Sequence, residues 1–285
     1  MSLVPRATAA ALAIAVTAAA PGHAADARLE RGAYLVNGIA ACGNCHTPKG
    51  PDRQPLVDQD LSGGVVFNTP AYRAIAANIT PDEDTGIGNW TDDQIVAAMR
   101  NGTRPDGTMI GPPMPIRSYR DMSDSDAKAI VAYLRSVRPI RHGVEKSSYR
   151  TAPPASDGPA VTHVPDPPRS NTPAYGEYLA SIGHCMECHT PAVNGRPDMT
   201  RTGAGGRPMN APPTGMVFSA NLTPANPDGI RSWTDEQIEQ TLITGVRPDG
   251  RRLARLMAFD WYRNIDRGDL DALVAYLRTL QPATP

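Results

Sequence analysis

The sequence predicts two tandem, mostly α-helical domains joined by a proline-rich linker. At an offset of 143 residues, matching segments recur from the cysteine motifs to the C-terminal region with no net insertion. Both copies contain the capping box that starts a helix, at 91–94 and again at 234–237. Eight prolines fall between 139 and 173, a density that disfavours helix and favours extended chain. We therefore expect domains at 25–140 and 173–285, with a linker at 141–172.

Helical periodicity supports the fold class in each copy. A first helix is expected from about Ala27 to Ala41, and its counterpart from Tyr175 towards Gly183. The last helix of each copy carries an apolar face at helical spacing. In copy one this face is Ala127, Ile130, Val131, Leu134 and Val137, and in copy two it is Leu270, Leu273, Val274, Leu277 and Leu280. Strand-like alternation is nearly absent.

Composition excludes some classes of protein. Hydrophobic residues make up 40%, charged residues 20%, and mean hydropathy is -0.36, as in soluble globular proteins. Lys+Arg number 28 against 29 Asp+Glu, a formal net charge of -1. A nucleic-acid binder that neutralises phosphates needs a basic excess, so no nucleic-acid partner is expected. Aromatics, at 5%, are scarce for two cores.

Residues 1–24 have the build of a secretory signal peptide. One positive charge, Arg6, precedes an apolar run from Ala7 to Ala20 and a small-residue exit at Ala24 and Ala25. A bilayer span needs about 20 apolar residues, so an uncleaved anchor is the alternative. We expect a bacterial periplasmic protein with at most peripheral membrane association.

All four cysteines belong to two Cys-x-x-Cys-His units. These units comprise Cys42, Cys45 and His46, and Cys185, Cys188 and His189. Disulfides are the default in an exported protein, and a zinc site is a second possibility. Neither explains a histidine directly after the second cysteine, twice. Covalent haem c attachment does, with thioether bonds to both cysteines and the histidine as iron ligand. The sequence thus predicts two haem c groups, which also explains the scarcity of aromatics.

The repeat indicates the sixth iron ligand of each haem. Of ten methionines, only Met114 and Met257 superimpose at offset 143, each 68 residues after its motif histidine. Met109 is the competitor, but Arg252 occupies its matching position. Methionines can also simply fill gaps. The shared register favours Met114 and Met257 as axial ligands.

Other matched side chains suit haem propionates. Indole and guanidinium groups donate hydrogen bonds to carboxylates. The candidates are Trp90, Trp233, Arg104 and Arg247. Core packing for the tryptophans and solvated loop charge for the arginines are the alternatives.

Two further features concern the second copy. His184 precedes Cys185 and is expected at the surface or at a haem edge. The loop before Met257 holds three arginines in five residues, at 251, 252 and 255. We expect them to face an acidic partner, with propionate binding or closure of the domain interface as alternatives.

These motifs resemble those of the class I c-type cytochromes. Each half is similar to the modules in cytochrome c subunits of periplasmic dehydrogenases, such as the alcohol and gluconate enzymes. The similarity covers nearly all of 27–138 and 174–280, and rests on shared elements at 78–81, 90–91, 106–107 and 114–115. Those subunits typically carry three modules and a C-terminal membrane-associating segment, whereas the repeat here has two copies.

The resemblance implies a periplasmic dihaem cytochrome c that carries single electrons. The donor would be a periplasmic dehydrogenase, and the acceptor a terminal oxidase or another cytochrome. An iron with both axial ligands supplied by His and Met has no open position for substrate, so we expect an electron-transfer protein rather than an enzyme. The alternatives are a dihaem cytochrome c peroxidase, the electron-transfer subunit of a dehydrogenase complex, and a redox-silent subunit that only docks a partner.

Overall fold

The computed structural model describes residues 21–153, 158–169, 172–193, 196–211, 214–225 and 227–284. Most of the expected signal peptide, residues 1–20, lies outside the described residues. None of the helices in the described residues combines the length and apolar character that crossing a membrane requires. The described helices are α1 (Pro21–Asn37), α2 (Cys42–His46), α3 (Asp92–Asn101), α4 (Ile116–Tyr119), α5 (Asp124–Ser136), α6 (Pro173–Ile182), α7 (Cys185–His189), α8 (Asp235–Thr244), α9 (Phe259–Tyr262) and α10 (Arg267–Thr279).

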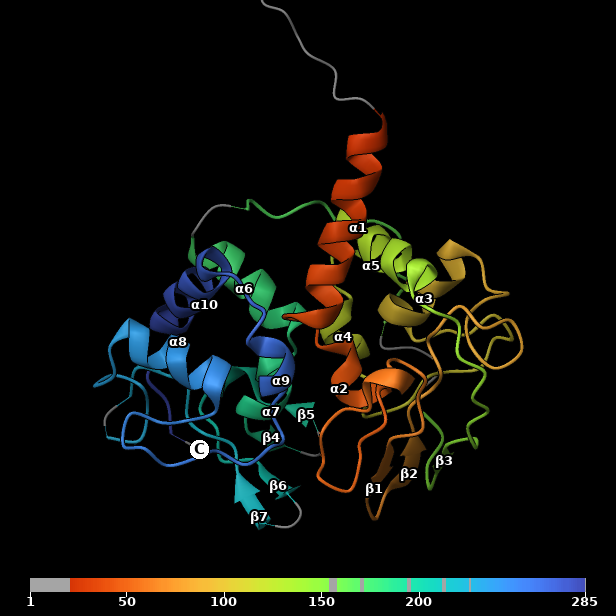
Figure 1. Ribbon diagram of the computed structural model, residues 1–285. Coiled ribbons are helices and arrows are strands. Elements are labelled where there is room, and N and C mark those ends of the chain that lie inside the picture. The colour runs from red at the N-terminus through yellow and green to blue at the C-terminus, as the bar shows by residue number, and fades with distance from the viewer. Residues whose placement is uncertain are drawn as a thin grey trace, which may run out of the picture.

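Two mostly α-helical domains lie side by side, as predicted (Figure 1). In each, the first long helix packs across the last, α1 on α5 and α6 on α10. Gly32 and Gly176 sit at these crossings, where an added Cβ would lie only 1.9 Å from the carbonyl oxygens of Ala129 and Ala272. The two backbones therefore approach as closely as only glycine permits. This glycine pair escapes the offset of 143 because the two positions are 144 residues apart.

Helices α3 and α8 begin as the sequence predicts. In both, the threonine side chain accepts from the backbone N–H of the glutamine, and the glutamine side chain accepts from the threonine N–H. Arg135 of α5 and Arg278 of α10 donate to backbone carbonyls in the turns before these helices, including those of Ile87 and Ile230 at 3.0 Å. The last helix of each domain, α5 or α10, thus fixes the start of α3 or α8.

The first helix of the first domain, α1, departs from its predicted bounds. α1 begins at Pro21 and ends at Asn37, four residues before Ala41, because the Ala40 N–H bonds back to the Leu35 carbonyl at 3.0 Å. Ala41 then adopts a left-handed conformation, with φ 46°, which ends any continuation of the helix. α6 matches its expected span more closely.

Short strands are the elements that the sequence pattern missed. They are β1 (Val66–Asn68), β2 (Tyr72–Ile75), β3 (Ser148–Tyr149), β4 (Ala192–Val193), β5 (Arg196–Pro197), β6 (Pro208–Ala211) and β7 (Gly215–Phe218). The hairpins β1–β2 and β6–β7 are repeat equivalents and lie at the lower end of the two domains in Figure 1. Strands of two to four residues are too short to show an alternating pattern.

The hairpins also show how the repeat keeps its length. In the first domain Val66 pairs with Ile75, whereas in the second Met209 pairs with Val217. Between motif and hairpin the second domain has one residue fewer, since the His46 carbonyl accepts from Gly63 but the His189 carbonyl accepts from Gly205. One extra residue in the second hairpin turn restores the offset of 143.

The proline-rich segment runs along the first domain. Its strand β3 pairs with β2, and the Tyr149 hydroxyl donates to the Pro112 carbonyl at 3.0 Å. Farther on, the Val161 N–H donates to Asn101 at 2.8 Å and the Val164 carbonyl accepts from the Asp124 N–H at 2.9 Å. The described part of the segment is therefore a strap that covers the Met114 loop.

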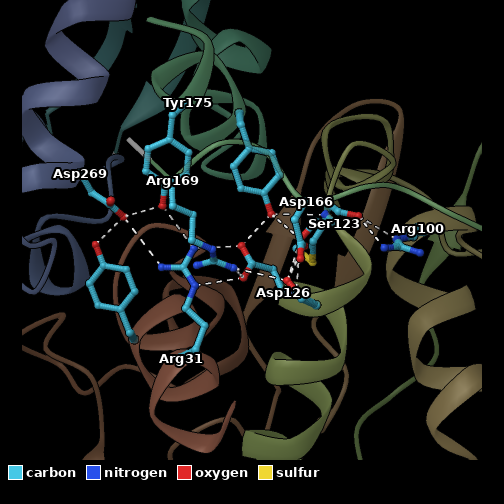
Figure 2. Close-up of polar contacts among 12 residues, drawn as sticks. Arg31, Arg100, Ser123, Asp126, Asp166, Arg169, Tyr175 and Asp269 are labelled. Atoms are coloured by element: carbon cyan, nitrogen blue, oxygen red, sulfur yellow. Dashed lines mark hydrogen bonds and ion pairs between the residues drawn. The ribbon is translucent and has the colours of Figure 1, made fainter. Parts of the chain in front are cut away.

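The two domains share one hydrophobic core and a buried polar cluster at their interface (Figure 2). Arg31 of α1 donates to Asp126 at 2.9 and 3.0 Å, and its Nη1 lies 4.0 Å from Asp269. Asp126 and Asp269 are repeat equivalents, and each accepts a tyrosine hydroxyl from the opposite domain. Tyr178 donates to Asp126 at 2.7 Å, and Tyr34 donates to Asp269 at 2.8 Å.

The equivalent aspartates differ in their electrostatics. Burial acts to raise the pKa of both carboxyls, and the neighbouring groups oppose it to different extents. At Asp126 the hydrogen bonds and charge of Arg31, with the hydrogen bonds from Tyr178 and Arg169, outweigh burial and hold the pKa below its usual value. At Asp269 the Tyr34 hydrogen bond and the more distant Arg31 do not compensate, and the pKa stays raised. The cluster therefore stabilises a charged Asp126 but not a charged Asp269.

We predict that Gly32→Ala and Gly176→Ala each destabilise the protein, because the new methyl group meets backbone that cannot rotate away. Overpacking of this kind costs about 1–3 kcal/mol. Gly268→Ala is the matched control, since its Cβ would meet nothing closer than 3.6 Å. It should be neutral or stabilise by up to about 1 kcal/mol through helix propensity. Urea unfolding of the three variants measures the difference, and equal stability of all three would contradict the close crossing.

We predict that Asp126→Asn lowers the free energy of unfolding at pH 7 by about 2 kcal/mol, as for loss of a charged hydrogen bond. Asp269→Asn should change it by less than about 1 kcal/mol, because the raised pKa shows that its charge is not stabilised. The Asp126 contribution is present above the unfolded pKa of about 3.9 and is lost as pH falls through its lower folded pKa. Denaturant unfolding at several pH values would show this loss of unfolding free energy in acid for the wild type and not for Asp126→Asn. A larger effect of Asp269→Asn would reverse the assignment.

Candidate functional site

The two Cys-x-x-Cys-His motifs form the short helices α2 and α7. Each is preceded by a residue in left-handed conformation, Ala41 with φ 46° and His184 with φ 47°. This conformation turns the chain sharply out of the long helix that comes before. The two cysteines and the histidine of each motif therefore lie within about one helical turn, with both cysteines half-buried.

Both motif histidines are oriented by a backbone carbonyl. His46 Nδ1 lies 2.8 Å from the Ala77 oxygen, and His189 Nδ1 lies 2.8 Å from the Ala220 oxygen. A carbonyl only accepts, so Nδ1 donates, and the neutral ring keeps Nε2 as its free electron-pair donor. Burial lowers the pKa of both imidazoles, which favours this neutral form. A metal-ligating histidine needs this protonation and this fixed orientation.

The Asn-x-Thr-Pro elements at 78–81 and 221–224 hold those carbonyls in place. The buried Asn78 accepts from the Thr80 N–H at 3.0 Å and donates to the Ile140 carbonyl at 2.7 Å. Asn221 makes the same two bonds, to Thr223 and Ala283, at 2.8 and 2.7 Å. Because Ala77 and Ala220 directly precede these asparagines, the elements position the histidine acceptors. The repeat shows that both copies contain the Asn-x-Thr-Pro element, but only the folded chain shows that the element positions the carbonyl that accepts from the motif histidine.

All four cysteines are free thiols in the structure. Burial raises the pKa of Cys42 and Cys185 to about 12 and raises that of Cys45 and Cys188 as well. Zinc binds thiolates, and no group of three or more His, Cys, Asp or Glu side chains in the described ranges is arranged to hold a metal ion. The described residues therefore show neither a disulfide pair nor a cluster of four thiols.

Met114 and Met257 occupy equivalent places in the two domains. Each carbonyl accepts the backbone N–H two residues on, Met114 from Ile116 at 2.9 Å and Met257 from Phe259 at 3.0 Å. Both side chains are partly buried against the shared core, which also contacts Cys42 and Cys185. The competitor Met109 lies at an isolated bridge with Thr103, whose hydroxyl is 3.8 Å from its sulfur.

The propionate candidates differ between the domains. Trp90 packs on the shared core, and Arg104 donates to the Met109 carbonyl at 2.8 Å. Arg247 lies over the Trp233 ring, 5.2 Å from its centroid. Its buried Nε forms an ion pair with Asp249 at 3.5 Å but makes no hydrogen bond within the described residues. The Arg247 side chain, which is 32% exposed, thus keeps one buried N–H group that a further acceptor would satisfy.

Two expectations for the second domain change. His184 lies at the domain interface, edge-on to Tyr119 with ring centroids 6.3 Å apart, and burial lowers its pKa to about 4. In the basic loop, Arg251 pairs with Asp249 at 2.7 Å and Arg255 pairs with Asp260. Their charges are compensated locally, so the loop is less basic than its sequence indicates.

The two motifs approach each other across the interface. The Trp261 indole packs on Gly43, with Nε1 2.7 Å from where a Cβ would stand, while Tyr119 packs on His184. Each short helix after a methionine thus contacts the motif of the opposite domain. The Cys188 thiol also contributes to the raised pKa of Cys45. No sequence pattern indicates this proximity, because Trp261 and Gly43 come from different copies.

The residues present fit covalently bound haem c. Each motif offers two thiols and an oriented neutral imidazole, and Arg247 adds an unsatisfied buried donor suited to a propionate. A family model for cytochrome c matches residues 29–138. With the relatives described next, this shows that the chain belongs to the cytochrome c family, whose members carry covalently bound haem c and transfer electrons.

The relatives include cytochrome subunits of dehydrogenases and a dihaem c-type cytochrome. A dihaem c-type cytochrome of Cereibacter sphaeroides is 31% identical over 83% of this chain and 81% of its own length. The fructose dehydrogenase cytochrome subunit of Gluconobacter japonicus is 31% identical over 91% of this chain and 54% of its own length. The gluconate 2-dehydrogenase cytochrome c subunit of Pantoea cypripedii is 30% identical over 94% and 63%. The chain thus spans between half and two thirds of these dehydrogenase subunits.

Proposed function

We propose that the chain is a dihaem cytochrome c that carries single electrons from a periplasmic dehydrogenase towards a terminal oxidase or another cytochrome. The duplicated motif, with each histidine held by an equivalent carbonyl, is the observation that carries the proposal. The proposal includes domains at 25–140 and 173–285, a linker at 141–172, and export directed by residues 1–24. The dehydrogenase subunits among the relatives support the choice of donor.

When bound, haem c supplies one-electron cycling between Fe(II) and Fe(III). The chain's part is attachment, ligation and burial. Cys42 and Cys45 of α2 would attach one haem, with His46 and Met114 as axial ligands. Cys185 and Cys188 of α7 would attach the other, with His189 and Met257. Arg247 would neutralise a propionate beside Trp233, and Trp90 and Arg104 would occupy the equivalent region of the first domain.

The domain interface favours electron transfer within the molecule. The two attachment helices lie near each other, with Trp261 and Tyr119 packed between the domains. The shared core and the Arg31 cluster fix the domains in one arrangement. With the attachment helices held near each other, an electron accepted at one site would pass to the other without a hinge motion. Met114 and Met257, as iron ligands, would leave no position for a peroxide substrate, so we favour electron transfer over peroxidase activity.

We predict two covalently bound haems per chain in the wild-type protein purified from periplasm. Cys45→Ala and Cys188→Ala should each remove or loosen one haem, since each deletes one thioether. Pyridine haemochrome analysis gives the haem-to-protein ratio, and Met109→Ala serves as the control that keeps both haems. One haem or none in wild type would refute the dihaem assignment.

The axial ligands can be tested separately. Ferric haem with His/Met ligation shows a weak sulfur-to-iron absorption band in the far red. We expect Met114→Ala and Met257→Ala each to remove about half of it and to lower one of two reduction potentials, because the thioether favours reduced iron. Met109→Ala should leave the band intact. Loss of the band in Met109→Ala but not in Met114→Ala would overturn the assignment by repeat.

A further inference from the structure

The two equivalent hairpins differ in what lies beside them. In the first domain the sheet has the order β1–β2–β3, and β3 comes from the strap. In the second domain the sheet contains only β6 and β7 within the described residues. The outer edge of β2 is thus covered by the chain itself, whereas no strand of the described residues pairs with the outer edge of β7, which we call the open edge.

The first domain shows how this edge binds an extended segment. Arg73 pairs with Ser148, and the Arg150 N–H donates to the Ala71 carbonyl at 2.9 Å. The Ile75 N–H donates to the Ser147 hydroxyl, also at 2.9 Å. Residues 71, 73 and 75 therefore turn their backbone groups towards the strap. Their equivalents at offset 143 are residues 214, 216 and 218.

The side chains at the open edge of β7 differ in polarity from those at the equivalent edge of β2. In the first domain the Arg73 guanidinium pairs with Glu145 of the strap at 2.8 Å. Met216 stands at the matching position and is 63% exposed, and Phe218, which matches Ile75, is 68% exposed. Two large apolar side chains on one face of an unpaired edge strand are unusual on a free surface. A segment that pairs here needs an apolar residue where the strap has Glu145.

We propose that the open edge of β7 binds an extended, locally uncharged and apolar segment of a partner protein, which adds a strand to the β6–β7 sheet. Main-chain hydrogen bonds to residues 214, 216 and 218 supply affinity, and Met216 and Phe218 supply the apolar contacts. Phe218 is two residues before Ala220, whose carbonyl orients His189. A partner held at this edge therefore lies beside the second attachment motif. The proposal stands on the hairpins alone and does not require the haem count.

The probe is a labelled, uncharged peptide with the sequence of residues 144–151 and the changes Glu145→Leu, Lys146→Leu and Arg150→Thr. We expect saturable binding to the full-length holoprotein, measured by fluorescence anisotropy, and slower hydrogen exchange at the amides of Met216 and Phe218. Met216→Pro removes an outward N–H but leaves the β6–β7 ladder, which an edge strand tolerates. It should weaken binding at least tenfold. Val193→Gln, at another exposed apolar residue, should leave binding unchanged.

A second experiment changes the peptide and keeps the wild-type protein. Methylating the peptide nitrogens that correspond to Ser148 and Arg150 removes the main-chain donors and should also weaken binding at least tenfold. The absence of saturable binding, or equal binding by the methylated peptide, would overturn the proposal. Sedimentation that shows a concentration-dependent dimer, abolished by Met216→Pro, would assign the edge to a second copy and also overturn it. Haem content of the same samples is measured in parallel, so failure here is distinguished from failure of the dihaem assignment.

Discussion

The approach of the first and last helices of each domain, backbone against backbone, is the constraint on which the molecule depends. Gly32 and Gly176 let α1 meet α5 and α6 meet α10 with no side chain between them. The end of the first helix then sets where α2 or α7 begins. The last helix, through Arg135 or Arg278, fixes the turn that starts α3 or α8. In each domain the helix crossing thus positions both the attachment motif and the helices around it.

Local signals in the sequence predicted most of this architecture. Capping boxes and apolar helical faces depend on neighbours within one or two turns, so α3, α5, α8 and α10 follow from the residues themselves. The hairpins could not be predicted because their strands are short. The Gly32–Gly176 pair could not be found at an offset of 143 because its two residues lie 144 apart. The attachment motifs could be recognised because their chemistry is contained in five consecutive residues.

Contacts between the copies were beyond the reach of the repeat. The Tyr34–Asp269 and Tyr178–Asp126 hydrogen bonds are equivalent to each other, because α1 and α6 correspond at an offset of 144 residues. At the offset of 143 found in the sequence, Tyr34 is set against Glu177 and Tyr178 against Leu35, so the match is hidden. Comparing the copies also does not show which residue of one copy contacts the other copy. Likewise, the sequence predicted His184 at the surface or at a haem edge and gave no sign of the interface contact with Tyr119 that the structure shows.

The core cluster that runs through both domains has a consequence for how independently the two halves can change. Two independent modules joined by a linker can be lost, exchanged or rearranged without harm to each other. Here each domain carries a buried aspartate that accepts a hydrogen bond from a tyrosine of the other. Each half is therefore part of the folding environment of the other, and a substitution at one of these tyrosines alters the surroundings of a buried carboxylate in the opposite half.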